Sequence, residues 1–190
     1  QSFDTMARER GLCPVIASTL RSPQEEKRIV ETLISYAIDA LFIAGATDQK
    51  QLGRVCTAAS LKHIYIDLPG RDAPSVITDN FKGAQMLTRR IIAEMPGHIK
   101  GPRAKPCLVG GVTGDHATER RVAAFRQTVA EWGAPPDDCQ ILQCGYAPEQ
   151  AAKAIADLCQ RIGGLPACLF VNSLTTFEGV MSHFATLPAS

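Results

Sequence analysis

The feature that most constrains the fold of this chain is a repeated alternation of short apolar runs with amphipathic segments. Apolar runs of strand length lie at residues 12–18, 40–44, 63–66, 75–78, 107–110, 139–144 and 167–171. Between them, apolar residues recur with helical spacing. Short, continuously apolar strands that alternate with helices are typical of parallel sheets covered on both faces. The sequence therefore predicts an α/β protein with doubly wound parallel sheets.

Helix boundaries carry recognisable signals. Ser22-Pro-Gln-Glu25 reads as a capping box with proline at the first helical position. Gly11, Gly133 and Gly163 each follow a helical pattern, where glycine commonly ends a helix. Helices are expected at residues 2–10, 23–37, 49–60, 80–95, 116–132, 148–162 and 175–187.

A break in this rhythm suggests two lobes. Residues 96–106 hold three prolines, two glycines and three basic residues, without an apolar period. Such composition is typical of a connection between domains. We predict an N-terminal lobe at residues 1–98, an inter-lobe crossover at 99–106 and a C-terminal lobe at 107–190.

Composition excludes several classes of protein. A formal net charge of +1 gives no broad basic surface for nucleic acid within this chain. No run of 18 apolar residues exists, so no membrane span is expected. The seven cysteines show no two-residue spacing of a zinc or redox motif. Four of them, Cys13, Cys107, Cys139 and Cys168, fall in apolar runs that read as buried strands. Unpaired structural thiols favour a reducing compartment, and hence a cytoplasmic location.

Asp79 is the first candidate site residue. It follows the apolar run at residues 75–78 and immediately precedes a helical pattern. Ligands of open α/β sheets bind at the carboxyl ends of strands, where a carboxylate can accept hydrogen bonds from two hydroxyls. The alternative is that Asp79 only caps its helix.

Four further candidates lie in the second half, near the ends of the predicted strands. Arg121 lies in the first turns of its helix, where its fork of donors could bridge hydroxyls, a carboxylate or a phosphate; the alternative is a surface arginine. Tyr146 directly follows a strand and could stack on a sugar face, or it could be a packed loop tyrosine. Asn172 and Ser173 end the last apolar run, where their alternative role is a helix cap.

Catalytic and cofactor motifs are missing from the sequence. There is no dinucleotide-binding or phosphate-binding glycine motif, and the stretch at residues 110–114 is only glycine-rich. The four histidines share no metal-ligand spacing, and no nucleophile has an evident base. We therefore expect a binding protein rather than an enzyme, with no cofactor and no metal.

At these residues the chain resembles the effector domain of the LacI/GalR family of transcriptional regulators. The resemblance runs through ARERGLCPVIAST, IDALFIAG, SVITDNFKGAQ, CLVGGVTGDHATERRVAAF and LFVNSLTTFEGVM, in that order. It implies a periplasmic-binding-protein-like fold of type I, with a sugar or related effector bound in the cleft between the lobes. It also implies a cytoplasmic, homodimeric repressor that binds operator DNA through a headpiece outside this chain. The alternative is a sugar-binding receptor of an ABC transporter, which shares the fold.

The resemblance also implies roles for individual residues. Asp79 corresponds to a ligand acceptor, Arg121 to the family's basic ligand contact and Tyr146 to its cleft aromatic. The strand-end asparagine of the family falls at Asn172 or Ser173. A ligand-reading loop position falls near Asp115, whose charge disfavours a phosphate there.

The effector implied by the resemblance is a sugar or a sugar phosphate. The last matching segment is similar to the fructose-repressor branch, which hints at a phosphorylated or ketose-like effector, and this conflicts with Asp115. Compared with the family pattern, the chain is expected to be incomplete at both ends. Its first strand, and the strands that return to the first lobe, are not in the sequence.

Overall fold

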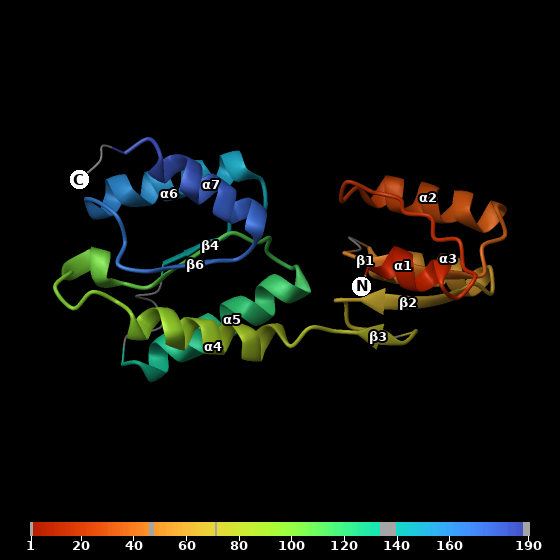
Figure 1. The fold of residues 1–190 in the computed structure, drawn as a ribbon, viewed down its shortest axis with the longest axis horizontal. Helices are drawn as coiled ribbons and strands as arrows, with labels where there is room; N and C mark the ends of the chain where they lie inside the picture. Colours follow the sequence, from red (N-terminus) through yellow and green to blue (C-terminus); the bar gives the residue numbers. More distant parts are fainter. Residues whose placement is uncertain (1, 46–47, 71, 134–139, 188–190) are drawn as a thin grey trace. The chain divides into compact units, whose positions relative to one another are not determined.

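The computed structural model describes residues 2–45, 48–70, 72–133 and 140–187. It divides into two compact units, Gln1–Ile77 and Thr78–Ser190 (Figure 1). Both contain a parallel sheet with helices, as the apolar pattern predicts. In the described part of the chain, no helix is both long and apolar enough to cross a membrane.

The first unit contains a sheet of three parallel strands in the order β1-β2-β3. Its elements are α1 (Phe3–Arg8), α2 (Pro23–Ser35), β1 (Ala40–Ala44), α3 (Gln49–Ala58), β2 (Lys62–Ile66) and β3 (Ser75–Val76). Ile43 and Tyr65 are register partners on neighbouring strands. Both belong to a buried cluster with Val30 of α2 and Leu52 of α3, so these two helices cover one face of the sheet.

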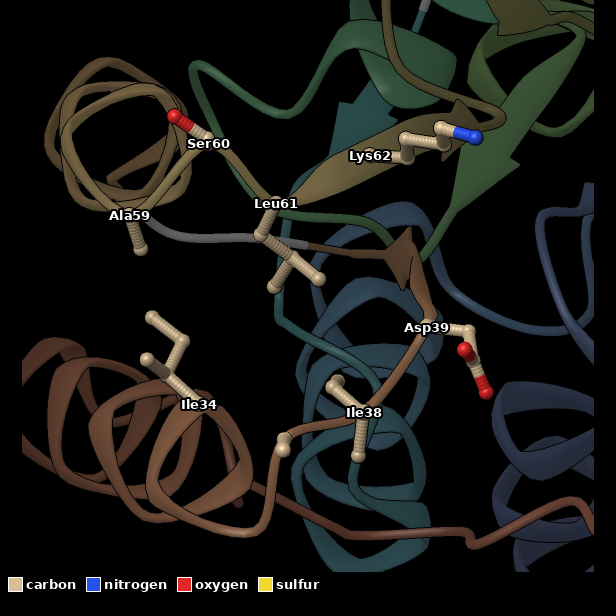
Figure 2. A pocket seen from close by; sticks show the side chains of 8 residues that line it. Ile34, Ile38, Asp39, Ala59, Ser60, Leu61 and Lys62 are labelled. Atoms are coloured by element: carbon tan, nitrogen blue, oxygen red, sulfur yellow. The ribbon is translucent and has the colours of Figure 1, made fainter.

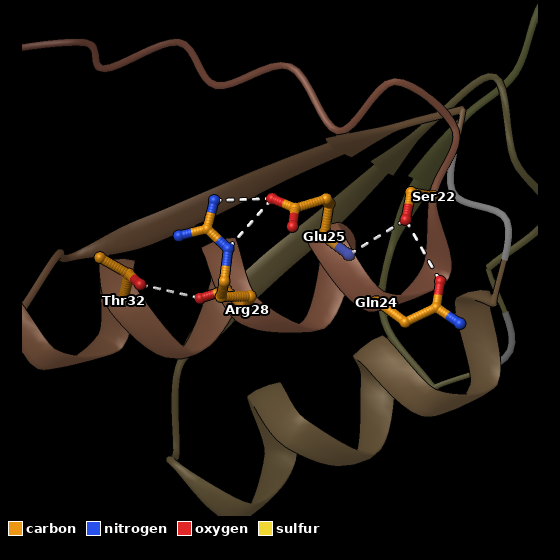
Figure 3. Close-up of polar contacts among 5 residues, drawn as sticks. All are labelled: Ser22, Gln24, Glu25, Arg28 and Thr32. Carbon is orange, nitrogen blue, oxygen red and sulfur yellow. Dashed lines mark hydrogen bonds and ion pairs between the residues drawn. The ribbon is translucent and has the colours of Figure 1, made fainter.

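The start of α2 follows the predicted capping signal in part. Ser22 is the N-cap, its hydroxyl accepts a hydrogen bond from the backbone N–H of Glu25, and Pro23 opens the helix. The Glu25 carboxylate does not reach back to the cap. It accepts instead from Arg28, at 2.6 Å from Nη2 (Figure 3). Only one half of a capping box is therefore formed.

The prediction of a strand at residues 12–18 is wrong. These residues form no strand, and Leu12, Val15 and Ile16 are 57%, 69% and 86% exposed. A strand needs a neighbour for its backbone hydrogen bonds, and no described strand pairs with this segment. Apolar composition alone does not supply that neighbour, and Cys13 is consequently exposed rather than buried.

The second unit contains a sheet of three parallel strands in the order β5-β4-β6. Its elements are α4 (Asn80–Ala93), η1 (Gly101–Ala104), β4 (Cys107–Val109), α5 (His116–Glu131), β5 (Gln140–Leu142), α6 (Pro148–Ile162), β6 (Leu169–Val171) and α7 (Leu174–Phe184). The predicted strand and helix positions are confirmed here to within a few residues. Cys139, expected to begin a strand, lies outside the described residues.

The central strand β4 divides this unit into two layers (Figure 1). Leu108 packs in a cluster with residues of α4 and α5, including Phe125. Its neighbours Cys107 and Val109 pack in a second cluster with Ile155 of α6 and Val180 of α7. Because side chains alternate across a strand, a three-residue apolar strand buries both faces under helices.

The boundary between units differs from the one expected at residues 99–106. The structure divides after Ile77, and α4 belongs to the second unit because Ala84 and Ile92 pack in the same cluster as Phe125 and Phe170. The proline-rich stretch leads from α4 into β4 within that unit and contains η1. An amphipathic pattern shows that a helix covers a sheet, but it does not show which sheet.

Most described thiols are at least partly buried. Burial raises the pKa of the Cys107 thiol, and it raises that of Cys168 to about 11. Both thiols are free. A raised pKa keeps such thiols protonated and weakly nucleophilic, which suits small apolar core residues.

Candidate functional site

The candidate site lies at the carboxyl edge of the sheet in the second unit. Strands β4 and β6 end at Val109 and Val171, and the loops that follow lead into α5 and α7. The beginning of α4 contributes to the same site, because Asn80 contacts a side chain of α5. Five of the six predicted site residues belong to one hydrogen-bonded network or to one cavity at this edge: Asp79, Asp115, Arg121, Tyr146 and Asn172.

Arg121 joins three elements. Its Nε donates to the side-chain Oδ1 of Asn80 at 2.9 Å. Its Nη1 donates to the backbone oxygen of Asn172 at 2.8 Å and to the Oδ1 of the same residue at 3.0 Å. Nη2 makes no hydrogen bond with the residues that the structure describes. The guanidinium is therefore held in place from one side, with one nitrogen left to donate.

A second set of contacts surrounds the Asp115 carboxylate. Its Oδ2 accepts from the backbone N–H of Thr118 at 3.1 Å, from the Thr118 hydroxyl at 2.9 Å and from the Tyr146 hydroxyl at 2.8 Å. Asn172 Nδ2 donates to the Thr118 hydroxyl at 3.4 Å. Asp115 and Tyr146 thus interact with each other, and the network reaches Arg121 through Asn172.

A cavity of about 270 Å³ opens beside this network. It is lined by Thr78, Asp79, Asn80, Gly83, Ala84, Leu87, Arg121, Phe170, Val171 and Asn172. The lining is polar where α4 begins and β6 ends, and apolar along the body of α4. A polar end with an apolar wall is suited to a ligand that has both hydroxyl groups and C–H faces.

Asp79 satisfies both readings of its sequence position. It is the N-cap of α4, and its Oδ1 accepts from the backbone N–H of Lys82 at 3.0 Å. It also lines the cavity, is exposed, and its Oδ2 makes no hydrogen bond with the described residues. One oxygen caps the helix and the other can accept from a ligand.

The structure separates Asn172 from Ser173. Asn172 is 6% exposed, lines the cavity and accepts from Arg121. The Ser173 hydroxyl instead accepts from the backbone N–H of Thr176, as the N-cap of α7. Ser173 therefore fits the cap alternative. Asp115 and Tyr146 are not among the residues that line the cavity.

Two buried polar residues of the site were missed from the sequence, Asn80 and Thr118. They are 5% and 0% exposed. Thr118 precedes Val122, Phe125 and Val129 at helical spacing, so the pattern placed it on the buried face of α5. Asn80 directly follows the strand-end acid, but nothing in its position indicates the arginine that it contacts.

Gly111 makes the close packing of these groups possible. Its φ is +88°, a left-handed conformation that glycine adopts without strain. A Cβ at this position would overlap the side chains of Asn172 and Thr118. A glycine-rich loop such as residues 110–114 can offer backbone N–H groups to an anion, but the N–H of Gly114 already donates to the Glu119 carboxylate at 3.0 Å.

The first unit contains a smaller hollow of about 200 Å³ (Figure 2). It lies where α2 and α3 end and β1 and β2 begin, with Ile34, Ile38 and Leu61 projecting towards it and Asp39 and Lys62 at its rim. This is the amino edge of the sheet, opposite to the edge where ligands of such folds bind. Among the residues described, no cluster of three or more His, Cys, Asp or Glu is arranged to hold a metal ion.

Comparison with known proteins gives a consistent set of relatives. The family model for periplasmic binding proteins and the sugar binding domain of the LacI family matches residues 9–173. The ribitol operon repressor of Klebsiella aerogenes is 35% identical over 133 residues, which cover 70% of this chain and 49% of that protein. The sucrose operon repressor of Klebsiella pneumoniae is 24% identical over 96% of this chain and 53% of that protein. The chain thus spans about half the length of these curated relatives.

Solved structures share the fold. The Cra transcriptional dual regulator of Pseudomonas putida, in complex with fructose 1-phosphate, gives a TM-score of 0.84 at 22% identity, covering 97% of this chain and 66% of that chain. The binding protein of an arabinose ABC transporter from Shewanella sp. ANA-3 gives 0.78 at 14% identity, covering 96% and 61%. The family match and the parallel α/β units confirm the resemblance read from the sequence: this chain belongs to the family of periplasmic binding proteins and LacI-type sugar-binding domains.

Proposed function

We propose that this chain is the effector-binding domain of a cytoplasmic, homodimeric LacI-type transcription regulator. Its effector is a sugar or related polyhydroxylated compound, bound at the carboxyl edge of the second unit. Effector binding changes the affinity of the protein for operator DNA. The observation that carries this proposal is the convergence of Asp79, Arg121 and Asn172 on one cavity.

The chemistry of these three groups suits hydroxyl ligands. Arg121 donates, the Asp79 carboxylate accepts, and an amide such as Asn172 does both. A hydroxyl also donates and accepts, so a compound with several hydroxyls can satisfy all three. The apolar wall formed by Leu87 and Phe170 is suited to the C–H face of such a compound.

The contacts of Arg121 supply a physical basis for control. This residue connects the beginning of α4, the helix α5 and the end of β6. A ligand that contacts Arg121 therefore acts on three elements at once. Regulation requires that the effector bind two conformations of the protein with different affinity. A coupling of 1–3 kcal/mol, about 5- to 150-fold in DNA affinity, is typical of such proteins.

A transport receptor is the second candidate, because the arabinose-binding protein shares the fold. The sequence relatives favour the regulator, since they include proteins named as the ribitol and sucrose operon repressors and a maltose regulon regulatory protein. Calorimetry of the full-length protein against sugars and polyols tests effector binding. A DNA-binding assay on the same full-length protein separates the two candidates, because the expected DNA-binding headpiece lies outside this chain. An effector-binding protein that binds no DNA would support the receptor.

Two substitutions test the site itself. Arg121→Ala and Asp79→Ala are each expected to weaken effector binding by about ten- to hundred-fold, as for the loss of a charge-assisted hydrogen bond. Arg126→Ala is the matched control, because Arg126 is exposed on the same helix and lines no part of the cavity. Unchanged effector affinity in both site variants would rule out this location.

A further inference from the structure

We infer that the effector of this protein is uncharged, a sugar or polyol without a phosphate group, and that the site excludes phosphorylated sugars. The inference rests on the proposed function and narrows its ligand class. It is based on the carboxylates that already accept hydrogen bonds at the helix N-termini of this edge, and on the hydrogen bonds that the Arg121 guanidinium already makes within the protein.

Two helix N-termini at this edge are already occupied by side-chain anions. The first turn of a helix presents unpaired backbone N–H groups and a positive dipole end, which is where phosphates commonly bind. Here the Asp79 carboxylate accepts from the first turn of α4 at 3.0 Å, and the Asp115 carboxylate accepts from the first turn of α5 at 3.1 Å. A phosphate would have to displace one of these carboxylates or lie beside it.

The glycine-rich loop before α5 is used in the same way. The backbone N–H of Gly114 donates to the Glu119 carboxylate at 3.0 Å. A third carboxylate of the protein therefore occupies a backbone donor that could otherwise bind an anion. The negative charges near the end of β4 make this part of the edge unfavourable for a second anion.

Arg121 cannot offer the usual fork to an anion. Arginine binds carboxylate and phosphate best through two parallel N–H groups on different nitrogens. Nε is committed to Asn80, and Nη1 donates to two oxygens of Asn172. Only the two N–H groups of Nη2 remain, and they diverge from one nitrogen. This geometry is suited to two neighbouring hydroxyl oxygens rather than to bidentate binding of a phosphate.

The charges of the cavity agree with this reading. Among its lining residues only Asp79 and Arg121 are charged, so their formal charges cancel. The other cations near this edge lie outside the lining: Lys82 is exposed on α4, and the Arg120 guanidinium lies over the Phe81 ring, 4.8 Å from its centroid. A phosphate monoester carries a charge of about −1.5 to −2 at neutral pH. The lining contains no cation left to balance it.

Calorimetry on the intact protein tests the inference with matched pairs. Each neutral pentitol, hexitol, pentose and hexose is titrated beside its phosphate ester, including ribitol with ribitol 5-phosphate and fructose with fructose 1-phosphate. The neutral member of the pair that binds is expected to bind at least ten-fold tighter than its ester. A phosphate ester that binds as tightly as its neutral partner, or tighter, would overturn the inference and leave the proposed function intact. No binding by any compound would overturn both.

A variant that lacks one negative charge tests whether the carboxylates of this edge cause the exclusion of phosphate. Asp115→Asn removes the negative charge but retains a good N-cap residue, and Asp115 does not line the cavity. The preference for the neutral partner is expected to fall by about ten-fold in this variant. Asp157→Asn, on the exposed face of α6, is the matched control and should leave the preference unchanged. An identical preference in Asp115→Asn and in the control would show that the Asp115 carboxylate does not exclude phosphate, and would overturn the part of the inference that rests on this charge.

Discussion

The free energy contributed by the hydrogen bond between Arg121 and Asn80 is the most quantitative test of the site. The two side chains are 41 positions apart in sequence and meet at 2.9 Å, and Asn80 is 5% exposed. A hydrogen bond to a charged group contributes about 1.5–3 kcal/mol, and a buried acceptor left without a donor costs about 1–3 kcal/mol. Asn80→Ala and Arg121→Ala should therefore each destabilise the second unit by at least about 1.5 kcal/mol.

A double-mutant cycle isolates this contact from the other effects of the two substitutions. Arg121→Ala also removes the donor to Asn172, so its own cost exceeds that of Asn80→Ala. The double variant should be less destabilised than the sum of the single variants, by about 1.5–3 kcal/mol.

The assay is equilibrium unfolding in urea of the two single variants and the double variant. The reference cycle pairs Asn80→Ala with Arg126→Ala, whose exposed side chain makes no hydrogen bond or ion pair with the described residues. The reference cycle is expected to be additive to within about 0.5 kcal/mol. If the Asn80–Arg121 cycle is additive to the same degree, the guanidinium is not held by Asn80. In that case Nε of Arg121 is also available to a ligand, beside Nη2.

Two further predictions concern backbone and pH. Gly111→Ala should strongly destabilise the second unit, because the added Cβ overlaps buried side chains and the φ of +88° is strained for any other residue. Gly114→Ala, whose Cβ meets nothing within 4 Å, is the control for left-handed backbone strain alone. Equal melting temperatures of the Gly111→Ala and Gly114→Ala variants would show that the Cβ overlap at Gly111 costs no stability. In the first unit, burial and the Asp72 carboxylate raise the pKa of Tyr65 from 10.0 to about 12. Because the folded pKa is the higher one, the stabilisation is fully present below pH 10 and is lost as the pH rises towards 12. Urea unfolding at pH 8 and pH 11 should show this loss, and Tyr65→Phe should reduce it; an unchanged pH dependence in that variant would contradict the assignment.

Much of the fold was predictable because it depends on local patterns. The strand at Ala40–Ala44 and the helix at Pro148–Ile162 have the predicted bounds. An apolar run of strand length, or a helical period that begins at a proline and ends at a glycine, specifies the element wherever it packs. The position of Asp79 between a strand end and a helix was likewise predictable, because the apolar run before it and the helical pattern after it are both local features of the sequence.

The failures arise where a local pattern depends on a distant partner. The apolar run at residues 12–18 has strand composition, but a strand forms only when another strand accepts its hydrogen bonds. The helix α4 has the predicted apolar face, yet that face packs with Phe125 and Phe170 in the second unit. Neither outcome can be read from the segment itself.

The same distinction applies to the site. The sequence by itself determined most of the helices and strands and the parallel class of the sheets. It also placed Asp79 and Asn172 at strand ends and Arg121 in the first turns of a helix, because each of these follows from spacing along the chain. Only the tertiary structure decided that Arg121 is held by Asn80 and Asn172, that Asp115 binds Tyr146 and that Ser173 serves as a cap. Those choices depend on hydrogen-bond distances between residues far apart in sequence, and only the folded packing of helices on the sheet sets these distances.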